Sequence, residues 1–295
     1  MADKLVRGNS MDGAIRVFAA VTTDLVNEAH RIHGTYPVAT AALGRLLTGA
    51  AIMGAAGLKS ETDSITLQIK GEGEIKDLVA VSDCQSRVRG YISNPYIDRP
   101  LKKNGKLDVG GAVGGGYLSV ARDLGLKEPY IGQIPLVTGE IAEDLTYYFA
   151  KSEQIPTSIA LGVLVDTDNS AIAAGGFMIQ LMPEATEEMA EELEKILRSA
   201  PPVTTMIQEG MTAEDILFRV TEGFPMVCEN KSITPEYKCT CSKERMERAL
   251  VSIGKKELQD IIDEQGEAEL TCRFCDNKYL FDKTALLALL EQAKG

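Results

Sequence analysis

A run of 22 residues determines how the N-terminal part of this chain folds: PVATAALGRLLTGAAIMGAAGL, residues 37–58. Arg45 is its only charged residue. Pro37 suits the first turn of a helix, where a backbone N–H is not needed. A helix that is apolar on every side lies either in a protein core or in a membrane. Because alanine and glycine dominate the run and Arg45 lies inside it, we expect a buried central helix rather than a membrane span.

The segments around this helix read mostly as strands. Short runs rich in β-branched residues are separated by turns such as Gly71–Gly73, and helices are predicted only over Thr23–Gly34 and Gly139–Ala150. Strands that follow one another as hairpins favour an α+β fold with antiparallel sheets over a doubly wound parallel sheet. The predicted strands are Arg16–Thr23, Ser64–Lys70, Asp77–Ser82, Ser86–Ser93, Tyr117–Leu124, Tyr130–Val137, Ser158–Asp166 and Ile172–Leu181.

The segment 181–232 is strongly acidic, with eleven acidic and four basic residues. Glu184–Arg198 predicts an amphipathic helix that Ala200–Pro202 ends, and Thr212–Val220 predicts a second one. Such a stretch repels itself and has only a narrow apolar stripe, so we expect marginally stable helices that fold against another part of the protein. We therefore divide the chain into an α+β core (1–182), a helical linker (183–231) and a C-terminal zinc module (232–295).

Four of the six cysteines form two close pairs, Cys239-Thr-Cys241 and Cys272-Arg-Phe-Cys275, with 30 residues between the pairs. Residues two apart on an extended strand point to the same side, and a CxxC in a hairpin lets both sulfurs face one ion about 2.3 Å away. A hairpin is predicted over Glu267–Phe281, which contains the second pair. The quartet therefore predicts one structural zinc ion with four thiolate ligands. Helices are predicted beside it over Lys243–Val251, Lys255–Gln265 and Thr284–Ala293.

The other candidate groups favour no further chemistry. Cys84 is interpreted as a small buried apolar group, and Cys228 as a bystander or an occasional oxidation site. His30 and His33 lie three apart without an HExxH pattern, so we assign them no metal role. The glycine run Gly110–Gly116 lacks the spacing of a phosphate-binding loop, so we expect a flexible hairpin loop there. No catalytic set is recognisable, and we do not expect an enzyme.

Charge and targeting signals narrow the class of protein. The net charge of −12 argues against a nucleic-acid binder, because such proteins use a basic face to neutralise phosphates. No basic, apolar signal segment opens the chain, so we expect a cytoplasmic protein. Cytoplasmic thiols stay reduced, which favours a bound metal over permanent disulfides.

At this point the whole chain resembles the heat shock protein 33 family, the redox-regulated bacterial holdase chaperones. The resemblance rests on the two cysteine pairs, on the apolar run Pro37–Leu58 and on Asp108–Gly116 (DVGGAVGGG). It implies that Cys239, Cys241, Cys272 and Cys275 bind one zinc ion in the reduced, inactive protein. It also implies that peroxide or hypochlorite, together with heat, forms disulfides, releases the zinc and unfolds the module and the linker.

The resemblance further implies the oxidised pairs and the partners. The disulfides would be Cys239–Cys241 and Cys272–Cys275, although Cys228 leaves room for another pairing. The partners would be unfolding client proteins during oxidative stress, bound without ATP, and a second copy of the chain in an active homodimer. No membrane is involved.

Two other readings remain. A zinc ribbon of a nucleic-acid- or ribosome-associated protein would use the modest basic cluster of Lys231, Lys238, Lys243, Arg245 and Arg248. A thiol–disulfide oxidoreductase would use the CxxC pair, but that pair lies in a predicted hairpin rather than at a helix N-terminus after a strand.

Overall fold

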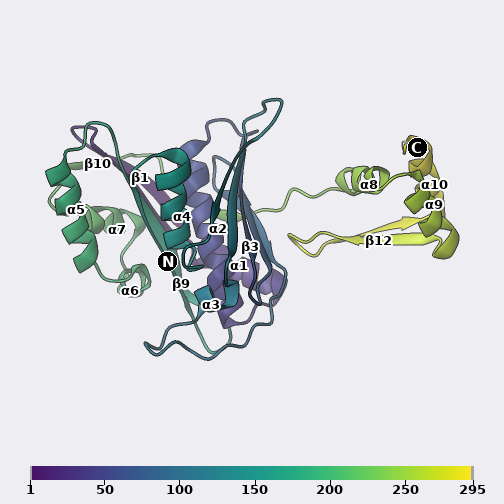
Figure 1. The fold of residues 1–295 in the computed structure, drawn as a ribbon, viewed down its shortest axis with the longest axis horizontal. Coiled ribbons are helices and arrows are strands. Elements are labelled where there is room, and N and C mark those ends of the chain that lie inside the picture. The colour runs from purple at the N-terminus through teal and green to yellow at the C-terminus, as the bar shows by residue number, and fades with distance from the viewer. Residues whose placement is uncertain (1, 294–295) are drawn as a thin grey trace. The chain divides into compact units, whose positions relative to one another are not determined.

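The structure is a computed structural model that describes residues 2–293. The chain forms two compact units, of which the first ends at Lys238 and the second begins at Cys239 (Figure 1). The first unit contains two sheets and most of the helices, and the second contains a hairpin and three helices. This mixed architecture confirms the α+β fold class.

The first sheet has five strands in the order β10-β1-β2-β9-β8, all antiparallel. The second sheet has six strands in the order β11-β5-β4-β3-β6-β7, antiparallel except for the parallel pair β11–β5. The strand bounds of the first sheet are Lys4–Ser10 (β1), Ile15–Val21 (β2), Thr157–Val165 (β8), Ala171–Leu181 (β9) and Met226–Cys228 (β10); those of the second are Ser64–Gly71 (β3), Asp77–Ser82 (β4), Arg87–Ile92 (β5), Gly116–Asp123 (β6), Tyr130–Pro135 (β7) and Glu236–Tyr237 (β11).

Helix α2 (Pro37–Gly57) lies between the two sheets and packs against strands of both (Figure 1). It is long and apolar enough to cross a membrane, but 94% of its most apolar window is buried in the protein. Its glycines allow this close packing: a Cβ atom on Gly44 would lie 2.8 Å from Val26, and one on Gly54 would lie 2.5 Å from the carbonyl oxygen of Asp83. The predicted buried central helix is therefore confirmed. Helix α1 (Thr23–His33) packs beside it.

The glycine run is not a flexible hairpin loop, and that prediction was wrong. Val109–Val113 forms a short helix, α3, and β6 begins at Gly116. The Asp108 side chain accepts a hydrogen bond from the Gly111 backbone N–H, and the carboxylate of Glu140 accepts one from Gly110, each at 3.1 Å. These acceptors satisfy the first backbone donors of the helix. Next in the chain are α4 (Ala142–Tyr148) and the π-helical turn η1 (Phe149–Glu153).

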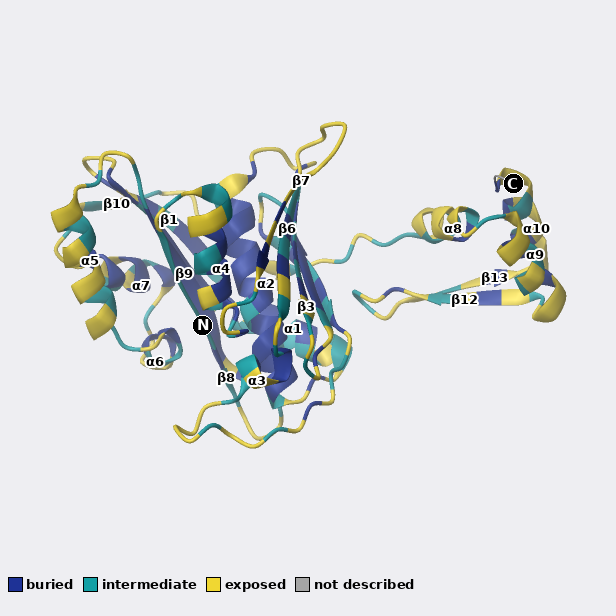
Figure 2. Cartoon of the chain, viewed as in Figure 1, coloured by how far each residue is buried: buried dark blue, intermediate teal, exposed yellow. Residues whose placement is uncertain are grey.

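The acidic segment folds onto the outer face of the first sheet. Helices α6 (Val203–Gln208) and α7 (Ala213–Val220) pack on this face, and their buried side chains form a second apolar cluster with β2 and β9 (Figure 2). Helix α5 (Glu187–Ser199) is mostly exposed and has one buried residue, Leu193. The linker helices thus rest on the core, with α5 the least buried of the three.

A strap, residues 226–238, links the linker helices to both sheets. Its strand β10 pairs with β1, Ile233 forms a bridge with Leu5, and β11 pairs with β5. The Tyr237 hydroxyl donates a hydrogen bond to the carbonyl oxygen of Gly90 at 2.6 Å. Residues 232–238, which the sequence-based division places in the C-terminal module, therefore pair with the first unit. The three-part division itself stays a prediction.

The second unit is small. Its strands β12 (Glu267–Thr271) and β13 (Lys278–Asp282) form the predicted hairpin, and Asp282 caps the last helix by accepting a hydrogen bond from Ala285 at 2.8 Å. Its core has eight buried residues, among them Phe281 and Leu258. The helices are α8 (Lys243–Ser252), α9 (Lys255–Glu264) and α10 (Lys283–Gln292).

Candidate metal centre

The four paired cysteines lie on two short segments of the second unit. Cys239 and Cys241 precede α8, and Cys272 and Cys275 lie in the turn between β12 and β13. The turn is tight, because the backbone N–H of Cys272 donates to Asn277 at 2.9 Å and that of Asp276 donates to Cys272 at 2.8 Å. Asp276 has a φ of 56°, which aspartate tolerates better than most residues. The hairpin register therefore brings both sulfurs of the CxxC pair to one side.

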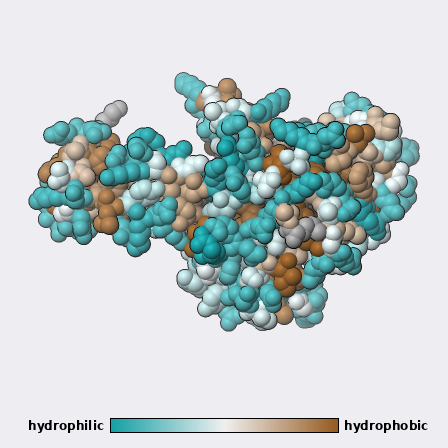
Figure 3. All heavy atoms as spheres, turned by 180° about the vertical axis from the view of Figure 1, so that it is seen from behind, coloured by the Kyte–Doolittle hydropathy of each residue, from teal (hydrophilic) through white to brown (hydrophobic). Residues whose placement is uncertain are grey.

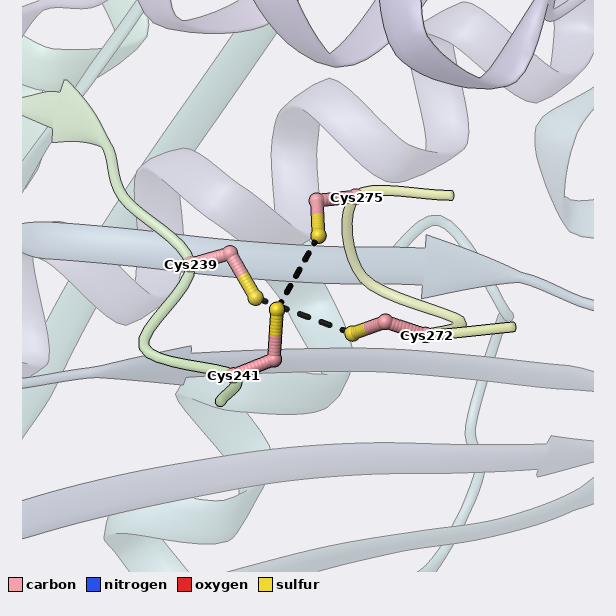
Figure 4. Close-up of side chains that lie close together, drawn as sticks. All are labelled: Cys239, Cys241, Cys272 and Cys275. Carbon is pink, nitrogen blue, oxygen red and sulfur yellow. Dashed lines mark hydrogen bonds between the residues drawn. The ribbon is translucent and has the colours of Figure 1, made fainter. Parts of the chain in front are cut away.

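The four sulfur atoms form one cluster (Figure 4). All lie within 4.8 Å of one another, with Sγ atoms 3.7 Å apart for Cys239 and Cys272 and 3.4 Å apart for Cys241 and Cys275. Zinc–sulfur bonds of about 2.3 Å in a tetrahedron place the sulfurs about 3.8 Å apart. The cluster therefore fits a tetrahedral metal ion, and its thiolate donors are those that zinc prefers. Among residues 2–293 it is the one group of this kind.

The pKa values of the thiols differ within the cluster. Burial raises the pKa of Cys241, but hydrogen bonds from the Tyr279 hydroxyl, 3.0 Å away, and from the other cysteines outweigh it and lower the pKa to about 7. Burial is the main cause that raises the pKa values of Cys239 and Cys275. One thiol is thus ready to ionise near neutral pH, and metal binding would deprotonate the others.

Tyr279 is a site residue that the sequence-based reasoning missed. Its hydrogen bond to the Cys241 sulfur raises the pKa of the phenol to about 12, so the hydroxyl remains a donor at neutral pH. The sequence shows only that Tyr279 and Phe281 lie two apart in the predicted hairpin and so share a face of a strand. In the structure Phe281 is fully buried in the module core. The face that packs the core is therefore continuous with the side that supports the sulfurs.

The two other cysteines and both histidines belong to the first unit and are not part of the cluster. Cys84 is half-buried rather than buried, and Cys228 lies on β10 opposite Gly8. Burial is the main cause that raises the pKa of each of these thiols, which makes them less reactive. The ring nitrogen Nδ1 of His30 lies 3.1 Å from the carbonyl oxygen of Thr35, and Nε2 of His33 lies 2.9 Å from that of Gly90.

Three of the five basic residues that the zinc-ribbon reading would need form local contacts. Lys238 lies 3.3 Å from the carboxylate of Glu236, and Arg245 donates a hydrogen bond to Thr240 at 2.8 Å. The Lys243 ammonium lies 5.6 Å from the centre of the Phe281 ring. These three side chains therefore have protein partners and do not require a nucleic acid to explain their positions.

Comparison with known proteins places the whole chain in one family. Residues 3–282 match the protein family described as "Hsp33 protein". The chain is 50% identical to a 33 kDa chaperonin of Clostridium beijerinckii over 295 residues, which is all of both chains. It is 51% identical to a 33 kDa chaperonin of Clostridium perfringens, over 99% of this chain and 92% of that one. These relatives are named as chaperones, not for a catalytic activity.

A solved structure agrees with the sequence relatives. The crystal structure of the 33 kDa chaperonin (heat shock protein 33 homolog) from Thermotoga maritima superposes with a TM-score of 0.90, at 39% identity and over 99% of each chain. The match therefore extends through the two sheets, the linker helices and the cysteine module. The family match, the relatives that align over nearly their whole length and the shared structure together show that the chain belongs to the Hsp33 chaperone family.

Proposed function

We propose that the chain is an ATP-independent holdase whose cysteine quartet is an oxidation switch. In the reduced state Cys239, Cys241, Cys272 and Cys275 hold one zinc ion, and the chaperone is inactive. The observation that carries this proposal is the cluster of four sulfurs within 4.8 Å of one another in a unit with eight buried core residues. So small a core makes the folding of the unit depend on what the cysteines bind.

Magnitudes support zinc as the main source of stability of the module. A core of this size supplies no more than about 3–5 kcal/mol. Structural zinc contributes roughly 10–16 kcal/mol in finger peptides. Loss of the ion therefore removes more free energy of folding than the module can supply by itself. The residues fit the metal, which when bound supplies only structural stabilisation.

The pairing of the oxidised cysteines determines whether oxidation unfolds the module. Disulfides within the pairs, Cys239–Cys241 and Cys272–Cys275, close loops of three and four residues and give about 1.6 and 1.9 kcal/mol. A disulfide between the pairs, such as Cys239–Cys272, closes about 34 residues and gives about 3.8 kcal/mol. The closest sulfurs belong to such cross pairs. We propose the local pairs, because only they leave the two segments unconnected after the zinc has gone.

The surface that binds clients is proposed to be the face of the first sheet that the linker helices cover. On the face shown in Figure 3 the exposed side chains are mostly hydrophilic, with apolar ones in small groups. A larger apolar surface is covered by α6 and α7, which pack on β2 and β9 through residues such as Val17, Phe177 and Ile179. The strap directly precedes Cys239 in the chain, so unfolding of the module releases its C-terminal end. Release of the strap and the linker helices would expose this sheet face to unfolding proteins.

Two further proposals accompany the switch. The protein acts in the cytoplasm, because a reducing compartment keeps four adjacent thiols free of disulfides until stress occurs. The active form is a homodimer, in which a released linker can dock on a second copy.

The test is suppression of aggregation. An unfolding client is followed by light scattering, with reduced protein and with protein treated with peroxide at elevated temperature, both without nucleotide. The proposal expects suppression only after oxidation, together with release of one zinc ion per chain. A matched control replaces the two other cysteines, Cys84 and Cys228, by serine and keeps the switch. Suppression by the reduced, zinc-loaded protein at the level of the oxidised protein would refute the switch, and salt-dependent RNA binding by the reduced protein would favour the zinc-ribbon reading.

A further inference from the structure

A polar cavity of about 550 Å³ lies between the strap and the rest of the first unit. One wall is the strap itself, which contributes residues 231–234 and Glu236. The other walls come from β1, from the residues that follow α2 and from the turn between β4 and β5. The volume is in the usual range of small-molecule sites. All lining residues belong to the first unit, so the cysteine quartet takes no part in the cavity.

Cations outnumber carboxylates in the lining of this cavity. The four cations are Arg7, Lys59, Arg87 and Lys231. The two carboxylates already have partners, since Glu61 accepts a hydrogen bond from Gln85 at 2.7 Å and Glu236 lies 3.3 Å from Lys238. The excess charge of the lining is therefore positive, although the chain as a whole carries −12.

Two of the four cations are uncompensated. The two arginines are each paired with a carboxylate outside the lining, at 3.3 Å for Arg7 and 2.5 Å for Arg87. Lys59 and Lys231 are exposed and form no ion pair with any residue from 2 to 293. Lys59 follows α2, whereas Lys231 belongs to the strap. An anion in the cavity would thus meet one available ammonium group from each side.

Neutral groups of the lining also suit an anion. Ser232 and Thr234 are exposed on the strap beside Lys231, and their hydroxyls can donate hydrogen bonds. The last turn of α2 brings partial negative charge to this region, but the Arg16 guanidinium donates to the carbonyl oxygen of Ala56 at 2.6 Å and offsets it. The side chains that remain, such as Leu58, give the cavity an apolar part.

We infer that this cavity binds a small phosphate compound, with phosphate oxygens between Lys59 and Lys231. Lysine ammonium groups and hydroxyls are common phosphate ligands, and phosphate oxygens accept several hydrogen bonds at once. A divalent cation would face two ammonium groups, and the carboxylates that it would need are engaged. The phosphate can come from an inorganic anion or from a nucleotide whose base lies on the apolar part, and the experiment separates these sources.

A ligand held from both sides ties the strap to the rest of the first unit. Between β10 and β11 the strap backbone bonds to β1 through Ile233, which exchanges hydrogen bonds of 2.8 and 2.9 Å with Leu5. A ligand that needs the docked strap, at 100 times its dissociation constant, lowers the equilibrium constant for strap release about a hundredfold. The compound would therefore slow activation by oxidation. This consequence rests on the proposed function, whereas binding of the compound does not.

The first test is calorimetric titration of the reduced, zinc-loaded full-length chain with pyrophosphate, ADP and adenosine at one ionic strength. Zinc content is checked afterwards, because pyrophosphate also binds metal ions. Saturable binding of the anions that weakens as salt rises is expected, and none of adenosine. Tighter binding of ADP than of pyrophosphate would assign a nucleotide as the ligand, and equal binding would assign the inorganic anion. Adenosine binding as tightly as ADP, or no binding of either anion, would overturn the inference.

Matched lysine variants locate the site. Lys59→Gln and Lys231→Gln each remove one uncompensated charge and should weaken pyrophosphate binding about fivefold, the upper range for an exposed ion pair. Lys127→Gln makes the same change in the exposed turn between β6 and β7, outside the cavity, and should alter binding less than twofold. Equal effects of all three would reveal general attraction to the surface, and the site would be lost.

Cys84 reports on occupancy of the cavity. It lines the cavity, whereas Cys228 is equally half-buried but lies outside the lining. Alkylation by iodoacetamide, which is uncharged, is followed for both thiols by peptide mass spectrometry in the reduced protein. Pyrophosphate should slow alkylation of Cys84 several-fold and leave that of Cys228 unchanged. An unchanged rate at Cys84 with saturating ligand would place the ligand elsewhere on the molecule.

Hydrogen exchange tests the link between the strap and the rest of the unit. The amides of Ile233 and Lys238 donate to Leu5 and Val88, so their exchange follows release of the strap. At 100 times the dissociation constant, pyrophosphate should slow both up to about a hundredfold and leave the amides of β12 and β13 unchanged. Binding without slower exchange of the strap would contradict the bridging role.

The last arm concerns activation. Pyrophosphate should slow activation by peroxide in the wild type and have no effect on the rate in the double variant Lys59→Gln/Lys231→Gln. Equal slowing in both proteins would show that the anion acts outside the cavity. The titration, alkylation and exchange results use only the reduced protein, so they decide the site whether or not oxidation activates the chain. Failure of the switch and failure of this site are therefore distinguishable.

Discussion

The two units of this chain are stabilised in different ways. The first unit has a cluster of 42 buried apolar residues around α2, supplemented by a second cluster under the linker helices. Among the described residues, the second has a cluster of eight buried apolar residues and four clustered thiols. Burial of apolar surface is insensitive to oxidants, whereas thiolate–metal bonds are lost when the sulfurs are oxidised. Under the proposed switch, the chain would therefore lose its second unit to oxidation and keep the first.

The largest expected effect comes from removal of a sulfur from the quartet. Cys272→Ser deletes the one buried cysteine of the cluster and should abolish tight zinc binding. The second unit should then be unfolded at 25 °C, a loss of several kcal/mol, because the core alone is too small. The measurement is zinc content together with NMR dispersion of residues 239–293. Cys84→Ser is the matched control and should bind one zinc with an unchanged spectrum.

The difference between the two units can also be tested by a substitution that destabilises the apolar core of the first unit. Gly54→Val would place a side chain 2.5 Å from the carbonyl oxygen of Asp83 and should destabilise the first unit by about 3 kcal/mol. Zinc content should stay at one per chain, because the second unit folds around its own ion. Gly57→Ala, with open space around the added carbon, is the control and should not lower stability. Calorimetry of the first unit measures both, and loss of zinc in Gly54→Val would contradict the independence of the two units.

A smaller effect is expected from Tyr279, which donates a hydrogen bond to the Cys241 sulfur. Tyr279→Phe removes only the hydroxyl group and should weaken zinc affinity about tenfold, the usual result of losing a partner of a metal ligand. Competition with a chromophoric chelator measures this. Tyr237→Phe, which changes a tyrosine of the first unit, serves as the control for the same chemical change. Equal zinc affinities of wild type and Tyr279→Phe would show that the hydroxyl has no role at the centre.

The smallest expected effect is a pH dependence confined to the first unit. Burial raises the pKa of Asp3 to about 6, although its carboxylate accepts hydrogen bonds from the backbone of Asp24 and Leu25. Because the folded pKa lies above the unfolded value of 3.8, the folded state binds the proton more tightly, and stability rises as pH falls through 6. Between pH 7.5 and 5.5 this contributes about 1 kcal/mol.

Chemical denaturation of the first unit at the two pH values measures this contribution. Asp3→Asn should lack it, whereas Asp12→Asn should keep it, because hydrogen bonds lower the pKa of Asp12 and it stays ionised throughout this range. A wild-type difference that survives in Asp3→Asn would assign the effect to another group.

Periodic, local signals made most of the fold predictable from the sequence. The apolar run of α2, the strands β2 to β9 and the hairpin around Cys272 and Cys275 were each visible in residue type and spacing, whereas β1 (Lys4–Ser10) was not predicted. The quartet was predicted because close cysteine pairs have few other uses in a reduced protein. The structure shows that these four sulfurs come together and that they suit a metal ion.

The missed features depend on distant partners. Helix α3 is completed by a hydrogen bond to Glu140, 30 residues from Gly110. Strands β10 and β11 have three and two residues, so their existence depends on β1 and β5 and not on their own sequence. The role of Tyr279 depends on its distance from Cys241, which the spacing of residues does not give. Local propensity cannot show contacts of this kind.

The most direct test of the central claim is NMR of the isotope-labelled full-length chain before and after oxidation with peroxide, with zinc and free thiols counted in the same sample. The account predicts one zinc and a dispersed spectrum for both units at the start. After oxidation it predicts no zinc, four fewer thiols, collapsed dispersion for residues 239–293, the strap and the linker helices, and intact signals from α2 and strands β1–β9. A C-terminal unit that stays fully dispersed after its zinc has been lost would contradict it.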